Sequence, residues 1–182
     1  MKMRTRTKNN SSDLRPRLSW LLIPVSAVML AVILNSLVIL SAIVPSVSMA
    51  DTLEKGSLII ASRLSYINAD VERGDIVIFS HPEINEKYVV KRVIAVGGDT
   101  VEIKEGRVYL NESSLPLEEN YVNEFSEDYM EKLTVPEGCL FVLGDNRRES
   151  VDSRYLDDRF VLAENVYAKV MFTLLPRIKK LY

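Results

Sequence analysis

Three short stretches of the chain carry side chains that could take part in covalent chemistry. Two serines, Ser46 and Ser48, lie two positions apart, and Lys91 lies inside an apolar run over residues 88–96. The third stretch, residues 144–155, is far more polar than its flanks. A serine hydroxyl is a weak nucleophile until a base takes its proton, and a lysine can be that base when its neutral form is favoured. These stretches could therefore supply a nucleophile and a base.

Each stretch also has an ordinary explanation, which is the better one when the stretch is taken alone. Residues 45–49 read as a linker, Lys91 as a residue on the solvent face of a strand, and residues 144–155 as a solvated loop. The lysine is the least easily explained, because strand alternation puts Val89 and Val93 on its own face. A lysine among valines is partly desolvated, which lowers its pKa.

Other catalytic and metal-binding patterns are missing from the sequence. It contains no G-x-S-x-G, S-x-x-K, P-loop or G-x-G-x-x-G motif. The lone Cys139 excludes an intrachain disulfide and a cysteine-based zinc site, and the lone His81 excludes a histidine-rich metal site. His81 precedes Pro82 at the end of an apolar run, so we expect a solvated loop histidine rather than a member of a catalytic triad.

The elements that must position these residues are mainly strands. Short runs rich in Val, Ile, Tyr and Phe are separated by turn residues, and strands do not alternate with helices, which predicts an all-β domain. The predicted strands are residues 57–61, 76–79, 88–96, 100–103, 107–110, 140–143 and 166–172. Residues 111–132 are acidic with few apolar positions and are predicted to form a long, partly ordered loop.

Residues 18–44 form an apolar run that is long enough to cross a bilayer as a helix, for which ~20 residues suffice. Residues 1–17 carry six basic residues against one acidic residue, so the positive-inside rule predicts a cytoplasmic tail. The rest, residues 45–182, is then an extracytoplasmic β-rich domain. Residues 48–50 also look like a signal-peptide cleavage site, but a signal-peptide core has only ~7–15 apolar residues, so we favour an uncleaved anchor.

The charge of the exported part excludes one class of partner. Residues 51–182 contain 17 basic and 24 acidic residues. A domain with this negative balance has no electrostatic basis for binding nucleic acid.

Taken together, these features resemble the bacterial type I signal peptidase (leader peptidase), a membrane-bound Ser-Lys endopeptidase, over most of the chain. Four motifs occur in the family's order behind an anchor of the expected orientation. They are similar to the serine box (residues 45–49), the R-G-D-I-V strand (73–77), the lysine box (91–94 with 97–99) and the G-D-N and S-x-D-S-R box (144–146 with 150–155).

The resemblance implies a largely antiparallel β-sheet domain behind one transmembrane helix, in a cell-membrane enzyme that needs no metal or cofactor. Its expected partners are secretory preproteins, with their signal peptides, and the lipid bilayer. The implied catalytic residues are Ser48 as nucleophile and Lys91 as general base, with the Ser48 N–H and the Ser46 hydroxyl as oxyanion donors. By the same resemblance Ser150 hydrogen-bonds the Lys91 ammonium, Asp152 and Arg154 form an ion pair that supports the dyad, and Met49 contacts substrate.

The chain departs from the family pattern at Val47, where Gly is usual, at Asp51, where Pro is usual, and at residues 156–157, where an aromatic-Gly pair is common. These changes concern substrate range and efficiency, since Ser48 and Lys91 are both present. Self-cleaving repressors of the LexA type and endoplasmic-reticulum signal peptidases are alternatives. The former carry a DNA-binding helix-turn-helix where this chain has an apolar run, and the latter use His in place of Lys91. A non-enzymatic β-domain that binds a partner through residues 111–132 is a third.

Overall fold

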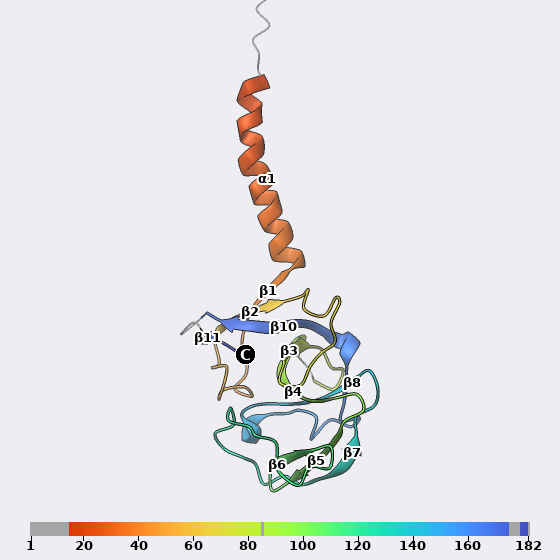
Figure 1. Cartoon of the computed structure of the whole chain (residues 1–182). Coiled ribbons are helices and arrows are strands. Elements are labelled where there is room, and N and C mark those ends of the chain that lie inside the picture. The colour runs from red at the N-terminus through yellow and green to blue at the C-terminus, as the bar shows by residue number, and fades with distance from the viewer. Residues whose placement is uncertain (1–14, 85, 175–178, 182) are drawn as a thin grey trace, which may run out of the picture. The chain divides into compact units, whose positions relative to one another are not determined.

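The N-terminal apolar run forms helix α1, Arg15–Leu37, which contains Pro24 (Figure 1). The computed structural model describes residues 15–84, 86–174 and 179–181. Of the predicted tail, residues 1–17, the first 14 residues therefore lie outside the described residues. The chain divides between Leu37 and Val38 into two units. In the part of the chain that is described, no helix combines the length and the apolar character needed to cross a membrane.

The helix expected over residues 18–44 is wrong for its last part, because strand β1 occupies Ile39–Ile43. An apolar run of this kind does not by itself distinguish a helix from a strand, and Ile39 and Ile43 carry the β-branched side chains that strands favour. Strand β1 pairs antiparallel with β2, Leu58–Ser62, which satisfies its backbone groups. Leu40 and Ala42 pack against the core, whereas the alternate side chains face solvent.

The second unit contains two antiparallel sheets, which confirms the predicted antiparallel β-sheet domain, whereas the predicted transmembrane helix is not confirmed. Eight described strands form the larger sheet, in the order β1-β2-β10-β3-β4-β8-β9, with β11 beside β10. Three form the smaller sheet, in the order β6-β5-β7, at the end of this unit away from β1 and β2 (Figure 1). The remaining bounds are β3 (Ile76–Phe79), β4 (Val89–Val96), β5 (Thr100–Lys104), β6 (Arg107–Leu110), β7 (Met130–Thr134), β8 (Cys139–Leu143), β9 (Val161–Leu162), β10 (Val166–Thr173) and β11 (Lys179–Lys180).

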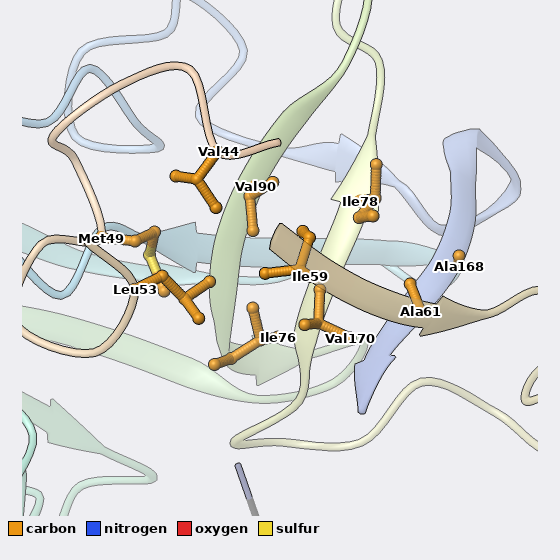
Figure 2. Packing of buried hydrophobic residues seen from close by; sticks show 10 residues of the cluster. All are labelled: Val44, Met49, Leu53, Ile59, Ala61, Ile76, Ile78, Val90, Ala168 and Val170. Atoms are coloured by element: carbon orange, nitrogen blue, oxygen red, sulfur yellow. The ribbon is translucent and has the colours of Figure 1, made fainter. Parts of the chain in front are cut away.

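One core cluster anchors the loop that carries the two serines. Val44, Met49 and Leu53 are each at most 2% exposed and belong to the same cluster as Ile59 and Val90. Figure 2 shows these side chains converging from the loop, β2 and β4. The backbone around Ser48 is therefore held on both sides by buried apolar residues, which fixes its position relative to β4.

The segment from residue 111 to residue 129, here called the strap, connects β6 to β7. It contains no strand or helix, as the sequence predicts, but the predicted loop ends earlier than residue 132 because β7 begins at Met130. Glu119 and Val122 of the strap are buried. The strap is therefore packed onto the rest of the unit rather than solvated along its length.

Candidate active site

The serine segment, residues 45–53, forms a tight turn between β1 and β2. The Ala50 N–H donates to the Val47 carbonyl at 2.9 Å, and the Thr52 N–H donates to the Met49 carbonyl at 2.9 Å. Ser48 is buried, and its hydroxyl oxygen lies 3.2 Å from that of Ser46. The two hydroxyls are thus in hydrogen-bond contact within this turn.

The loop after β8, residues 144–149 (here called the clamp), holds this turn through its backbone and one amide side chain. The Asn146 N–H donates to the Ser48 carbonyl at 3.1 Å, and Asn146 Nδ2 donates to the Val47 carbonyl at 3.1 Å. The Asp145 N–H points to Met49 Sδ at 3.4 Å. Two segments far apart in sequence are joined here by contacts on three consecutive residues, 47–49.

Gly144 is the point of closest approach in the clamp. A Cβ atom at this position would collide both with the hydroxyl oxygen of Ser150 and with the backbone carbonyl of Ser48. The need for glycine here comes from this close approach. The Ser48 carbonyl and the Ser150 hydroxyl therefore both lie against Gly144, where a side chain would otherwise be.

Lys91 comes from the middle of β4 and is 3% exposed. It pairs across the sheet with Val77, and Val77, Val89 and Val93 share one core cluster, so the valine surroundings that the sequence predicts are present. Its ammonium donates to Ser150 Oγ at 2.9 Å. Burial lowers the pKa of Lys91 to about 8, while the negative charge of Asp152 acts in the opposite direction.

Asp152 organises the groups around Lys91. Ser150 Oγ donates to Asp152 Oδ2 at 2.6 Å, and the Gly144 N–H donates to the same oxygen at 2.9 Å. Arg154 forms an ion pair with Asp152, with Nε at 2.8 Å from Oδ1. Because the guanidinium is next to the carboxylate, it offsets the charge that would otherwise keep Lys91 protonated.

Ser48 and Lys91 converge on this region from different elements, but no hydrogen bond between described residues joins them directly. Ser48 Oγ is in contact with Ser46, and Lys91 Nζ is in contact with Ser150. Catalytic hydrogen bonds are often long in unliganded proteins and shorten when substrate binds. Proton transfer from Ser48 to Lys91 would therefore require the two side chains to come closer when substrate binds.

A buried ion pair that sequence reasoning did not single out supports the clamp. Arg92, next to Lys91 in β4, donates to both oxygens of Asp145 at 2.9 and 2.7 Å. Thr52 of the serine segment donates to the same carboxylate at 2.5 Å. The adjacent Lys91-Arg92 pair was the available signal, because two neighbouring strand positions face opposite sides and both are buried here.

Burial bears on two expectations about single residues. His81 is 8% exposed rather than solvated, because the Ser80 N–H bonds to the Asn165 carbonyl and the Ile84 N–H bonds back to the His81 carbonyl, which folds the loop inward. Met49, the predicted substrate contact, is 1% exposed. Its side chain packs in the core cluster and anchors the serine turn, and its contact with a substrate stays a prediction.

An apolar cavity of about 420 Å³ opens beside the serine segment. It is bounded by Pro45 at the start of that segment and by side chains of β1, β3 and β4, with charged Glu86 and Lys87 also in its lining. Val90 of this cavity immediately precedes Lys91. The cavity therefore borders both the serine segment and the strand that carries Lys91.

The described residues contain no group of three or more His, Cys, Asp or Glu side chains arranged to hold a metal ion. The reactive groups that the site brings together are two serine hydroxyls and a buried lysine amine.

Comparison with known proteins places the chain in a family. Residues 17–175 match the family model described as signal peptidase, peptidase S26. The chain is 34% identical over 157 residues to the probable signal peptidase I-1 of Synechocystis, with 82% of this chain and 78% of that protein covered. It is 36% identical over 146 residues to thylakoidal processing peptidase 1 of Arabidopsis thaliana, which covers 75% of this chain but only 42% of that protein's length.

A solved structure of a signal peptidase I from Enterococcus faecalis V583 has 34% sequence identity and a TM-score of 0.45, and covers 56% of this chain and 97% of that one. The family match extends over the serine segment, β4 and the clamp together. The chain therefore belongs to the signal peptidase family, peptidase S26, and is a serine endopeptidase of that family.

Proposed function

We propose that this protein removes N-terminal signal peptides from exported preproteins as a membrane-anchored endopeptidase with a Ser48–Lys91 dyad. The observation that carries the proposal is the environment of Lys91. It is buried among valines, it has a pKa lowered to about 8 by that burial, and it contacts a serine that flanks the clamp on the Ser48 turn. A lysine with this pKa is partly neutral near physiological pH and can accept a proton.

In the proposed reaction, Ser48 Oγ attacks the carbonyl carbon of the scissile peptide while Lys91 accepts the hydroxyl proton. The tetrahedral intermediate collapses when Lys91 returns that proton to the leaving amine, so the peptide bond breaks and an acyl-enzyme ester remains. Water then attacks the ester, Lys91 takes a proton from the water, and Ser48 regains its hydroxyl. The reaction thus consumes one water molecule, and Lys91 and Ser48 end in the protonation states in which they began.

Ser46 is proposed to stabilise the oxyanion together with the Ser48 N–H. Its hydroxyl lies 3.2 Å from Ser48 Oγ, close to where the carbonyl oxygen of an attacked peptide would gain charge. Hydrogen-bond donors in this position lower the barrier because they interact more strongly with the oxyanion than with the neutral carbonyl. Ser150, Asp152 and Arg154 are proposed to orient Lys91 and to limit the rise of its pKa.

The cavity beside Pro45 is proposed to bind side chains that precede the scissile bond. Small apolar residues precede the cleavage site of a signal peptide, and a cavity of about 420 Å³ lined mainly by apolar side chains suits them. No role for nucleic acid is proposed, since residues 51–182 carry an excess of acidic side chains.

The proposed localisation is the cell membrane, with residues 1–17 cytoplasmic and the peptidase unit outside. The basis is the uncharged run over residues 18–44 behind six basic residues, of which the part up to Leu37 is helical in α1. The bilayer would hold the enzyme where preproteins emerge with their own apolar segments still in the membrane.

The full-length protein, purified in detergent and incubated with a preprotein, tests the proposal. Removal of the signal peptide, shown by a shortened product with a new N-terminus, is expected for the unchanged protein and not for Ser48→Ala. Cleavage that persists in Ser48→Ala, or no cleavage by the unchanged protein, would contradict the proposed function. Self-cleavage alone would instead favour the repressor-like alternative.

A further inference from the structure

The strap touches each of the segments that carry the proposed catalytic residues or their supports. Its Tyr121 ring lies 3.9 Å from the guanidinium of Arg92 in β4. The Asn123 N–H donates to Asp51 of the serine segment at 2.9 Å, and Asp128 accepts from Arg154 at 2.6 Å. An acidic loop with no strand or helix is thus bonded to three separate parts of the site.

The deepest of these contacts is an ion pair between Glu119 of the strap and Arg147 of the clamp loop. Both side chains are 1% exposed, and the guanidinium donates through two nitrogens to the two carboxylate oxygens. The Tyr121 hydroxyl donates to the same carboxylate at 2.9 Å. Burying two charges is costly unless their hydrogen bonds are satisfied, so this pair holds one defined geometry.

The third nitrogen of Arg147 connects this pair to the clamp. Arg147 Nε donates to the Gly144 carbonyl at 3.0 Å, and the Arg147 carbonyl accepts from Arg154 at 2.8 Å. Gly144 is also the residue against which the Ser48 carbonyl and the Ser150 hydroxyl both lie. The orientation of the Arg147 side chain therefore helps to set the distance between the serine turn and the partner of Lys91.

We propose that Glu119 and Arg147 are positioning residues for the reaction: Glu119 orients Arg147, and Arg147 holds the Gly144 carbonyl so that Ser48 and the Lys91–Ser150 pair keep their reactive alignment. This inference rests on the proposed function, because it assigns Glu119 and Arg147 a role in that reaction. Neither residue reaches the reacting atoms, so their effect is on alignment. A small misalignment of reacting groups costs about 10²-fold in rate.

Three variants of the full-length protein test the proposal with a preprotein-derived peptide. Glu119→Gln removes the charge that orients Arg147. Arg147→Lys keeps a cation for Glu119 but has only one nitrogen, so it lacks the separate Nε that donates to the Gly144 carbonyl. Glu124→Gln is the matched control, because Glu124 pairs with Arg148 across the same strap and loop at 3.1 Å but both side chains are more than half exposed.

We expect kcat per folded molecule to fall about 10- to 100-fold in Glu119→Gln and in Arg147→Lys, with KM unchanged, because alignment affects the transition state more than substrate binding. Glu124→Gln should keep both constants. The folded fraction of each variant at the assay temperature is measured by circular dichroism. The Arg147→Lys variant, which retains the opposite charges, guards against a Glu119→Gln protein that unfolds.

Wild-type kcat in either buried-pair variant would overturn the proposal, as would a loss that disappears once rates are expressed per folded molecule. An equal loss in Glu124→Gln would show that any change in the strap has this effect and would also overturn it. Ser48→Ala is assayed in parallel: cleavage by that variant would contradict the proposed function itself, and the positioning role would fall with it.

Discussion

At the scale of single residues, the pKa of Lys91 is the balance of two opposing environments. Burial among valines favours the neutral amine, whereas Asp152 favours the ammonium. Arg154 and Ser150 both bond to Asp152, so most of its hydrogen-bonding capacity is directed away from the lysine. Ser150 therefore links Lys91 to Asp152, and among the described residues Lys91 forms no direct ion pair with a carboxylate.

Substitution of Ser48 and substitution of Ser46 should have different effects on catalysis. Ser48→Ala removes the proposed nucleophile, so turnover should fall to background. Ser46→Ala removes one of two oxyanion donors, which typically costs ~10²–10³ in kcat and leaves KM nearly unchanged. Steady-state kinetics on one preprotein-derived peptide distinguishes them, with Ser113→Ala in the exposed part of the strap as a control. An active Ser48→Ala with a dead Ser46→Ala would reverse the two roles.

At the scale of elements, the loop after β8 has to approach the serine turn more closely than a side chain allows. Gly144→Ala should therefore push the Ser48 carbonyl away from Ser150 or displace Ser150 from Lys91. We expect kcat to fall at least ~10²-fold, since reacting groups would be misplaced by about an ångström. Stopped assays on the full-length variant, with the melting temperature as a control for folding, check this. Unchanged kcat would mean that the close approach has no catalytic importance.

The sequence predicted the strands that carry the site because each has a β-rich run between turn residues. The predicted bounds of β3 and β6 agree with the structure, and β4 begins one residue later than expected. Strand β1 was missed because its apolar residues continue the apolar run of the helix, and hydropathy alone cannot place that boundary. Strand β7 was missed because its Glu131 and Lys132 read as loop, although β5 supplies its hydrogen bonds.

The contacts of the site were predictable only where a motif named both partners. The Lys91–Ser150 contact and the Asp152–Arg154 ion pair were expected from motifs and are present, whereas their catalytic roles stay predictions. The Glu119–Arg147 pair joins two loops that no local pattern links. Burial of His81 was missed for the same reason, because it depends on contacts with a distant part of the chain.

At the scale of the whole molecule, charge and hydropathy divide the chain more sharply than its average composition suggests. Residues 1–17 are basic, residues 18–50 contain no charged side chain, and residues 51–182 have more acidic than basic side chains. This arrangement is typical of a protein that keeps its N-terminus in the cytoplasm and exports the part beyond its apolar run. It also matches the proposed substrates, which reach the enzyme from within the membrane.

Topology gives a prediction at this scale. Protease added to spheroplasts should digest the β-rich unit, residues 45–182, because the excess of positive over negative charge lies on the N-terminal side of the apolar run. Immunoblotting with an antibody to the C-terminal part follows the digestion, and a cytoplasmic protein serves as the control for intact cells. Full protection of the unit would contradict both the orientation and the proposed function.

The rate of cleavage as a function of pH, measured for the unchanged protein and for Lys91→Arg and His81→Ala, tests the central claim most directly. Neutral Lys91 is the proposed base, so kcat/KM should be low in acid and rise through an apparent pKa near 8 to a plateau. Lys91→Arg should be inactive at every pH, because arginine stays protonated, and His81→Ala should keep the profile. An active Lys91→Arg together with an inactive His81→Ala would replace the lysine base with histidine and contradict the account.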